Sequence, residues 1–143
     1  MKFQFRKAVK SQRKARIALI GPSGSGKTYT ALEIATGLAG PGGRIALIDT
    51  ENASASLYAD RFDFDTLNLA SFSPQVYKEA IHAAEEAGYD VIIIDSLSHA
   101  WAGKDGALEQ VDKAAARTKG NTFAAWREVT PQHNALVDAI VRA

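Results

Sequence analysis

A glycine-rich octapeptide near the start of the chain matches the phosphate-binding pattern G-x-x-x-x-G-K-[ST]. The glycines in this pattern let backbone N–H groups turn inward around an anion, and the N-terminus of a following helix adds a positive dipole. Its lysine reaches the terminal phosphates and its threonine hydroxyl is a ligand for Mg²⁺. These residues, with the adjoining Tyr29, are therefore predicted to bind a nucleotide, with a chance match as the alternative: Gly21, Pro22, Ser23, Gly24, Ser25, Gly26, Lys27 and Thr28.

A second candidate for the site is Asp95, which follows the apolar run Val91-Ile92-Ile93-Ile94. Such a run is typical of a buried parallel strand. The carboxyl ends of parallel strands meet at the edge of the sheet where ligands bind. Asp95 is therefore predicted to lie near Thr28, as a second ligand of the metal and a catalytic residue alongside Lys27.

The third candidate is Glu51, because Asp95 is followed by Ser96 and not by the glutamate that many ATPases carry there. Glu51 comes just after the predicted strand 44–49, at the same edge of the sheet. A carboxylate there can orient and deprotonate a water in line with the γ-phosphate. The alternative is a surface glutamate, or one placed for the dipole of the next helix. Asp49 is interpreted as a structural acid.

Composition is that of one globular domain, with 143 residues, 46% of them hydrophobic, and no cysteine. Neither a membrane span nor a signal peptide is apparent, which predicts a cytosolic protein. The charge is uneven. Residues 1–16 hold seven Lys or Arg and no acid, whereas the remainder holds ten basic and sixteen acidic residues. A basic arm over 1–15 is compatible with nucleic-acid binding, although a solvated tail or strand, part of it an edge strand, is favoured.

The order of apolar runs and turn residues predicts an α/β fold, a parallel sheet flanked by helices. Residues 16–143 form its core, and because no strand follows the last helix we expect the N-terminal part of a longer domain. The expected strands are 16–20, 44–49, 66–70 and 89–94. The expected helices are 27–38, 54–61, 74–87, 106–118 and 130–143, with a loop over 95–104.

The phosphate loop is followed by the segment I-D-T-E-N-A and then by the segment V-I-I-I-D-S. In these motifs and their order, residues 16–100 resemble the RecA-type recombinase ATPases, a class of P-loop NTPases. The resemblance implies that Glu51 is the catalytic carboxylate, that Tyr58 stacks on adenine, and that Asp95-Ser96 ends the Walker-B strand. The whole chain is similar to RecA-like ATPases of phages and prophages, including those linked to single-strand annealing.

This resemblance implies a Mg²⁺-dependent ATPase of phage origin in DNA recombination, annealing or repair. It implies single-stranded DNA as a partner and a homo-oligomer with ATP between subunits. In that family the strand between the phosphate-loop strand and the Walker-B strand comes later in sequence, here beyond Ala143, as do the DNA-binding loops. The chain alone is therefore expected to bind nucleotide poorly and to hydrolyse it slowly.

Several side chains allow more than one interpretation. Tyr58 is an adenine platform or a core aromatic. His99 is a sensor of the γ-phosphate, a DNA contact or, as favoured, a loop histidine without a role. Trp101 and Trp126 stack on bases or, as favoured, pack against the core.

Other functions remain open at this point. A small-molecule or nucleotide kinase shares the loop and the size, but it usually needs an arginine-rich lid over the phosphates. The region after Asp95 has Arg117 and Arg127 but no cluster of arginines. A non-catalytic, nucleotide-gated accessory module is a further alternative. A GTPase is disfavoured, because neither D-x-x-G after the loop nor N-K-x-D occurs.

Overall fold

A computed structural model of the chain describes residues 4–9 and 13–143. The rest of the basic arm, 1–3 and 10–12, lies outside the described residues. Residues 4–9 are exposed and form no regular structure. The elements follow in the order α1 (Lys27–Ala39), β1 (Ile45–Asp49), the 3-10 helix η1 (Ser54–Tyr58), β2 (Asp65–Asn68), α2 (Pro74–Glu86), β3 (Val91–Asp95), α3 (His99–Ala102), α4 (Ala107–Arg117) and α5 (Thr122–Arg142).

The three strands form a parallel sheet in the order β2-β1-β3. All five residues of the central strand β1 are buried, as its apolar sequence predicts. In the pairing register Asp49 lies opposite both Asn68 and Asp95. The carboxyl ends of all three strands therefore share one edge of the sheet. The expected α/β architecture, a parallel sheet flanked by helices, is confirmed.

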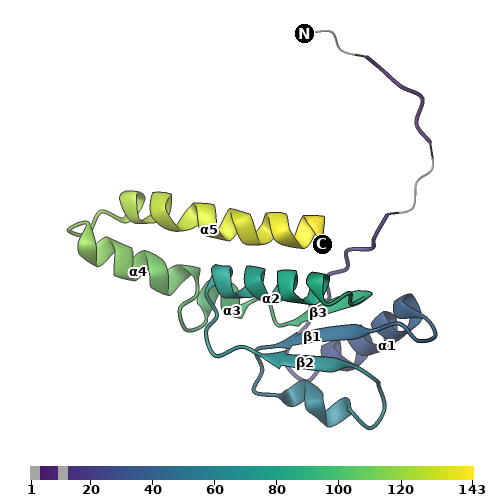
Figure 1. Cartoon of the computed structure of the whole chain (residues 1–143). Coiled ribbons are helices and arrows are strands. Elements are labelled where there is room, and N and C mark those ends of the chain that lie inside the picture. Colours follow the sequence, from purple (N-terminus) through teal and green to yellow (C-terminus); the bar gives the residue numbers. More distant parts are fainter. Residues whose placement is uncertain (1–3, 10–12) are drawn as a thin grey trace.

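Helices cover both faces of the sheet (Figure 1). Because successive strand residues point to opposite faces, Leu47 packs with Leu32 of α1 on one side. Ile48 packs on the other side with Tyr77 of α2 and Leu136 of α5. Each face thus has its own apolar core, and the carboxyl edge of the sheet is left for polar side chains.

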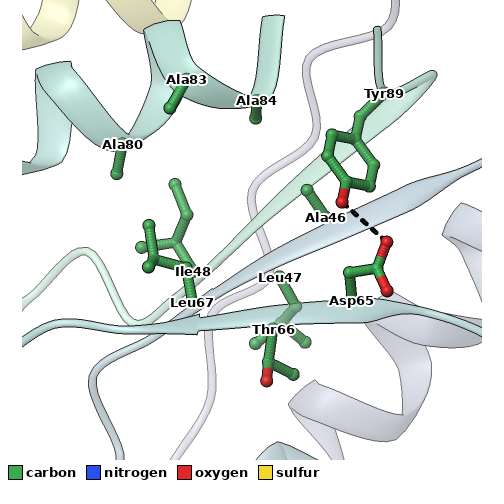
Figure 2. A pocket seen from close by; sticks show the side chains of 10 residues that line it. All are labelled: Ala46, Leu47, Ile48, Asp65, Thr66, Leu67, Ala80, Ala83, Ala84 and Tyr89. Atoms are coloured by element: carbon green, nitrogen blue, oxygen red, sulfur yellow. Dashed lines mark hydrogen bonds between the residues drawn. The ribbon is translucent and has the colours of Figure 1, made fainter. Parts of the chain in front are cut away.

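The helix over the second face begins where the sequence predicts. Ser73 caps α2, its hydroxyl accepting a hydrogen bond from the Val76 N–H at 3.3 Å, and Pro74 takes the first helical position. Figure 2 shows three alanines of α2 above Ile48 and Leu67. These small side chains leave a hollow between the helix and the sheet.

The amino ends of the strands are held by a different set of contacts. The Tyr89 hydroxyl donates to Asp65 Oδ2 at 2.7 Å, as Figure 2 shows, and the Arg44 guanidinium lies 4.1 Å from the Tyr89 ring centre. The hydrogen bond to Asp65 raises the pKa of Tyr89 above its ordinary value. These contacts tie β2 to β3 at the edge opposite the phosphate loop.

The strand predicted over 16–20 is wrong. Residues 13–22 form no regular structure, and Ile17 and Ile20 are 56% and 96% exposed. A strand requires a neighbour that accepts its ladder of hydrogen bonds. β3 pairs only with β1, and in the described part of the chain no other strand lies on its free side. Residues 17–20 are apolar, but in the described part of the chain they have no neighbouring strand with which to form hydrogen bonds.

Two helix predictions also need correction. The loop expected over 95–104 contains the short helix α3. The last helix begins at Thr122 and not at 130, because the Asn121 side chain accepts a hydrogen bond from the Ala124 N–H at 3.1 Å and caps it. Pro131 lies inside α5 on its exposed side and does not mark the start of the helix.

Candidate functional site

The phosphate-binding pattern forms an exposed loop that leads directly into α1. Gly24 and Gly26 have φ angles of +74° and +87°, a region that other residues rarely adopt. The loop closes on itself through a hydrogen bond from the Ser25 N–H to the Pro22 carbonyl at 3.3 Å. This conformation places a turn of backbone and the N-terminus of α1 at one point, as an anion site requires.

Lys27 folds back over that loop. Its Nζ donates to the carbonyl oxygens of Gly21 and Pro22, both at 2.7 Å. An ammonium has three hydrogens, so one donor remains for an outside oxygen. The charge is therefore already held at the mouth of the loop.

Thr28 and Asp95 are 67 residues apart in sequence and meet at the site. The Thr28 hydroxyl donates to Asp95 Oδ2 at 2.5 Å. A hydroxyl and a carboxylate oxygen fit the hard-oxygen preference of Mg²⁺, which binds through few protein ligands plus phosphate and water. Among the residues that the structure describes, no group of three or more His, Cys, Asp or Glu side chains is placed to hold a metal ion.

Asp49 has the structural role expected of it. The side chain is 2% exposed, and its two oxygens accept the N–H groups of Glu51 at 2.7 Å and Ala55 at 3.3 Å. These bonds shape the turn that follows β1. Asp49 therefore fixes where the backbone of Glu51 lies.

Glu51 lies at the carboxyl end of β1 with its side chain 45% exposed, so water reaches it. Its Oε1 accepts a hydrogen bond from the Ser96 hydroxyl at 3.0 Å. The preceding residue, Thr50, donates its N–H to the Asp95 carbonyl at 2.8 Å. The Glu51 and Asp95 backbones are thus joined across the two strand ends. The Asp95–Ser96 peptide bond is cis.

A polar network behind Glu51 was missed by the sequence analysis. Nδ1 of His99 lies 2.8 Å from Thr50 Oγ1 and 3.7 Å from Glu51 Oε1. The buried Tyr77 donates its hydroxyl to the Ser96 carbonyl at 2.8 Å, and burial raises the pKa of Tyr77, which keeps this donor protonated. The sequence offered one signal, a histidine four positions after Asp95.

Tyr29 and Tyr58 lie together beside the loop. Their ring centres are 5.9 Å apart in an edge-to-face arrangement, and Phe62 lies 5.3 Å from Tyr29. Tyr58 is half-buried against the cluster of Leu32 and Leu47. The structure thus brings Tyr58, the predicted adenine contact, beside Tyr29, which is predicted to bind the nucleotide, and both roles stay predictions.

Trp101 and Trp126 stack on each other with ring centres 5.5 Å apart, and His133 meets the edge of Trp101. Trp126 packs against a buried cluster of α4 and α5, as favoured from the sequence, whereas Trp101 is 42% exposed and is not part of a core cluster.

Two hollows mark the surface of the sheet. The hollow in Figure 2 lies at the amino ends of the strands, between α2 and β2, away from the phosphate loop. The other lies at the carboxyl ends of β1 and β2, next to Glu51. It is lined by Asp49, Thr50, Asn52, Ala53, Asn68, Leu69 and Phe72.

In the described part of the chain, none of the helices combines the length and the apolar character needed to cross a membrane.

Comparison with known proteins gives relatives that match part of the chain. The chain is 36% identical over 86 residues to the protein RecA of Wolbachia sp. subsp. Brugia malayi (strain TRS), 39% to RecA of Clostridium botulinum (strain Eklund 17B / Type B) and 34% to RecA of Ehrlichia ruminantium (strain Gardel). Each match covers 57% of this chain and 24% of the relative.

The chain thus spans about a quarter of the curated relatives it matches. No solved structure matches it. The AAA domain family matches residues 13–143. Because that match covers almost the whole chain, the protein belongs to the AAA domain family.

Proposed function

We propose that this chain binds ATP with Mg²⁺ and hydrolyses it as a RecA-like ATPase. The observation that carries the proposal is the 2.5 Å contact between Thr28 and Asp95, made at the end of the phosphate loop. Two hard oxygens from distant parts of the sequence meet there, next to the half-buried Lys27. The RecA relatives agree with this assignment.

The residues divide the work as follows. The loop from Gly21 to Thr28 binds the phosphates through its N–H groups, and Lys27 neutralises the charge at the γ-phosphate. Thr28 and Asp95 hold Mg²⁺, which, when bound, supplies positive charge to the phosphate oxygens. Glu51 accepts a proton from the attacking water. Tyr29 and Tyr58 contact the adenine.

We further propose that this ATPase acts on DNA in recombination, annealing or repair, with single-stranded DNA as the partner and a phage as its origin. The relatives are named RecA, and residues 1–16 carry seven positive charges for a phosphate backbone. We propose homo-oligomers with ATP at the subunit interface, because the phosphate loop is exposed and leaves one side of the nucleotide open to a neighbour.

The test is steady-state hydrolysis by the full 143-residue chain with ATP and Mg²⁺, without DNA, with single-stranded DNA and with duplex DNA. Single-stranded DNA is expected to stimulate turnover, and stimulation should fall as salt rises. Lys27→Ala should lower turnover at least about 100-fold, since it removes a charge that stabilises the transition state.

The matched control is Lys78→Ala, which removes a lysine from α2. It should turn over like the parent chain. Hydrolysis that survives Lys27→Ala would refute the ATPase assignment, and hydrolysis indifferent to both DNA forms would refute the link to DNA.

A further inference from the structure

His99 is the first residue of α3 and lies where the carboxyl ends of β1 and β3 meet. We propose that His99 is a positioning residue for Glu51, acting through a proton on Nδ1 that it shares with Thr50. The proposal rests on the proposed function, since it assigns Glu51 to the attacking water. Three contacts carry it, to Thr50, to Glu51 and to Phe72.

The first step is a count of hydrogens at the Thr50 hydroxyl. Its oxygen accepts the Ser96 N–H at 2.8 Å and lies 3.1 Å from the Ser96 carbonyl oxygen. His99 Nδ1 is 2.8 Å from the same oxygen. The hydroxyl has one hydrogen to give. If Nδ1 were bare, Nδ1 and the carbonyl would compete for it.

A hydrogen on Nδ1 removes that competition. Nδ1 then donates to Thr50, and Thr50 donates to the Ser96 carbonyl, which has a second lone pair for the Tyr77 hydroxyl. This form makes one hydrogen bond more than the form with a bare Nδ1, in which Thr50 would donate to Nδ1 and the carbonyl would keep only the Tyr77 hydroxyl. The geometry therefore favours the form of His99 that carries hydrogen on Nδ1.

The second step concerns how this hydrogen bond affects the position of the Glu51 carboxylate. Oε1 of Glu51 lies 3.7 Å from Nδ1 and 3.0 Å from the Ser96 hydroxyl. Of these two groups, the Ser96 hydroxyl is at hydrogen-bond distance from Oε1, and Thr50, which accepts the Nδ1 hydrogen, holds the backbone of Ser96. In the part of the chain that the structure describes, no hydrogen bond is made to Oε2. Holding Oε1 from behind leaves Oε2 for a water.

The third step is what holds the imidazole. Its ring stacks on Phe72, with centres 4.9 Å apart and planes inclined at 27°. The Phe72 N–H in turn donates to the Lys104 carbonyl at 3.0 Å, which ties this segment to the loop after α3. The ring plane of His99 is thus fixed, and with it the direction of the Nδ1–H bond.

The experiment replaces His99 by asparagine, glutamine and phenylalanine in the full chain. The asparagine amide nitrogen takes about the place of Nδ1, whereas that of glutamine takes about the place of Nε2. Phenylalanine keeps the stacking on Phe72 but has no donor. His99→Gln and His99→Phe should lower kcat for ATP about tenfold with KM unchanged, while His99→Asn should stay within about twofold of the parent.

The matched control is His82→Gln. His82 makes a similar histidine–glutamate contact, 3.0 Å to Glu85, on an exposed face of α2 far from the site. It should leave kcat unchanged. Equal activity of His99→Gln, His99→Phe and the parent chain would overturn the proposal, and so would loss of activity in His99→Asn equal to that in His99→Gln.

A second readout needs no catalysis. The chain has three histidines, and His99→Asn identifies the signals of His99. Long-range proton–nitrogen NMR on the folded chain should show its hydrogen on Nδ1. A hydrogen on Nε2 alone would overturn the proposal. If Lys27→Ala leaves hydrolysis intact, the proposed function fails independently, and the NMR result still decides the state of His99.

Discussion

Asp49→Asn tests how the site is built. The Asp49 carboxylate is 2% exposed and accepts two backbone N–H groups, one from Glu51 at 2.7 Å and one from Ala55 at 3.3 Å. Asparagine has one oxygen in place of two, so its amide N–H₂ must face one of these donors. The shorter bond to Glu51 is the one expected to survive, which leaves the buried Ala55 N–H without a partner.

An unsatisfied buried donor costs about 1–3 kcal/mol, and the surviving bond loses its charge assistance. We expect Asp49→Asn to lower the free energy of unfolding by about 2–3 kcal/mol. For a chain of this size that corresponds to a fall in Tm of roughly 5–10 °C. Urea unfolding followed by circular dichroism measures the free energy directly.

The matched control is Asp63→Asn, because Asp63 is exposed in the segment before β2. It should change stability by less than about 0.5 kcal/mol. An Asp49→Asn chain as stable as the Asp63→Asn chain would refute the view that Asp49 is a structural acid that sets the Glu51 backbone.

Two further predictions concern parts of the chain outside the site. Pro131→Ala should raise the free energy of unfolding by about 1–2 kcal/mol, measured by urea unfolding, because proline inside α5 cannot donate to the helix ladder; a destabilised variant would contradict this. Hydrogen bonds from Lys113 hold the pKa values of Asp105 and Glu109 below their ordinary values. The two ionised carboxylates therefore stabilise the fold above about pH 5, and this stabilisation is lost as the pH falls and they become protonated. Lys113→Met should therefore lose less stability than the parent between about pH 5 and about pH 2 in low salt, and parallel pH curves for the two chains would count against it.

The part of the site that is continuous in sequence could be predicted. The conformation of the loop from Gly21 to Thr28 depends on glycines with positive φ angles, which other amino acids rarely adopt. The run before Asp95 is apolar enough to indicate a buried strand. Parallel pairing then places the end of β3 beside the end of β1. Local signals suffice for all of this.

The rest depends on contacts that no local pattern encodes. Residues 16–20 have a strand-like sequence, but whether they pair depends on a neighbour elsewhere in the fold. α5 runs through Pro131 because its cap at Asn121 and its packing against α2 outweigh one missing donor. The position of His99 follows from the short helix α3, which begins within a segment that reads as a loop.

Glu51 is proposed to act in hydrolysis and not in binding, which Glu51→Gln tests most directly. Glu51→Gln keeps the shape of the side chain and removes its ability to accept a proton. Binding of a fluorescent ATP analogue and release of ADP should be measured on the same preparation. We expect an affinity within about twofold of the parent chain and a turnover lower by about 100-fold or more. Turnover equal to that of the parent chain would contradict it.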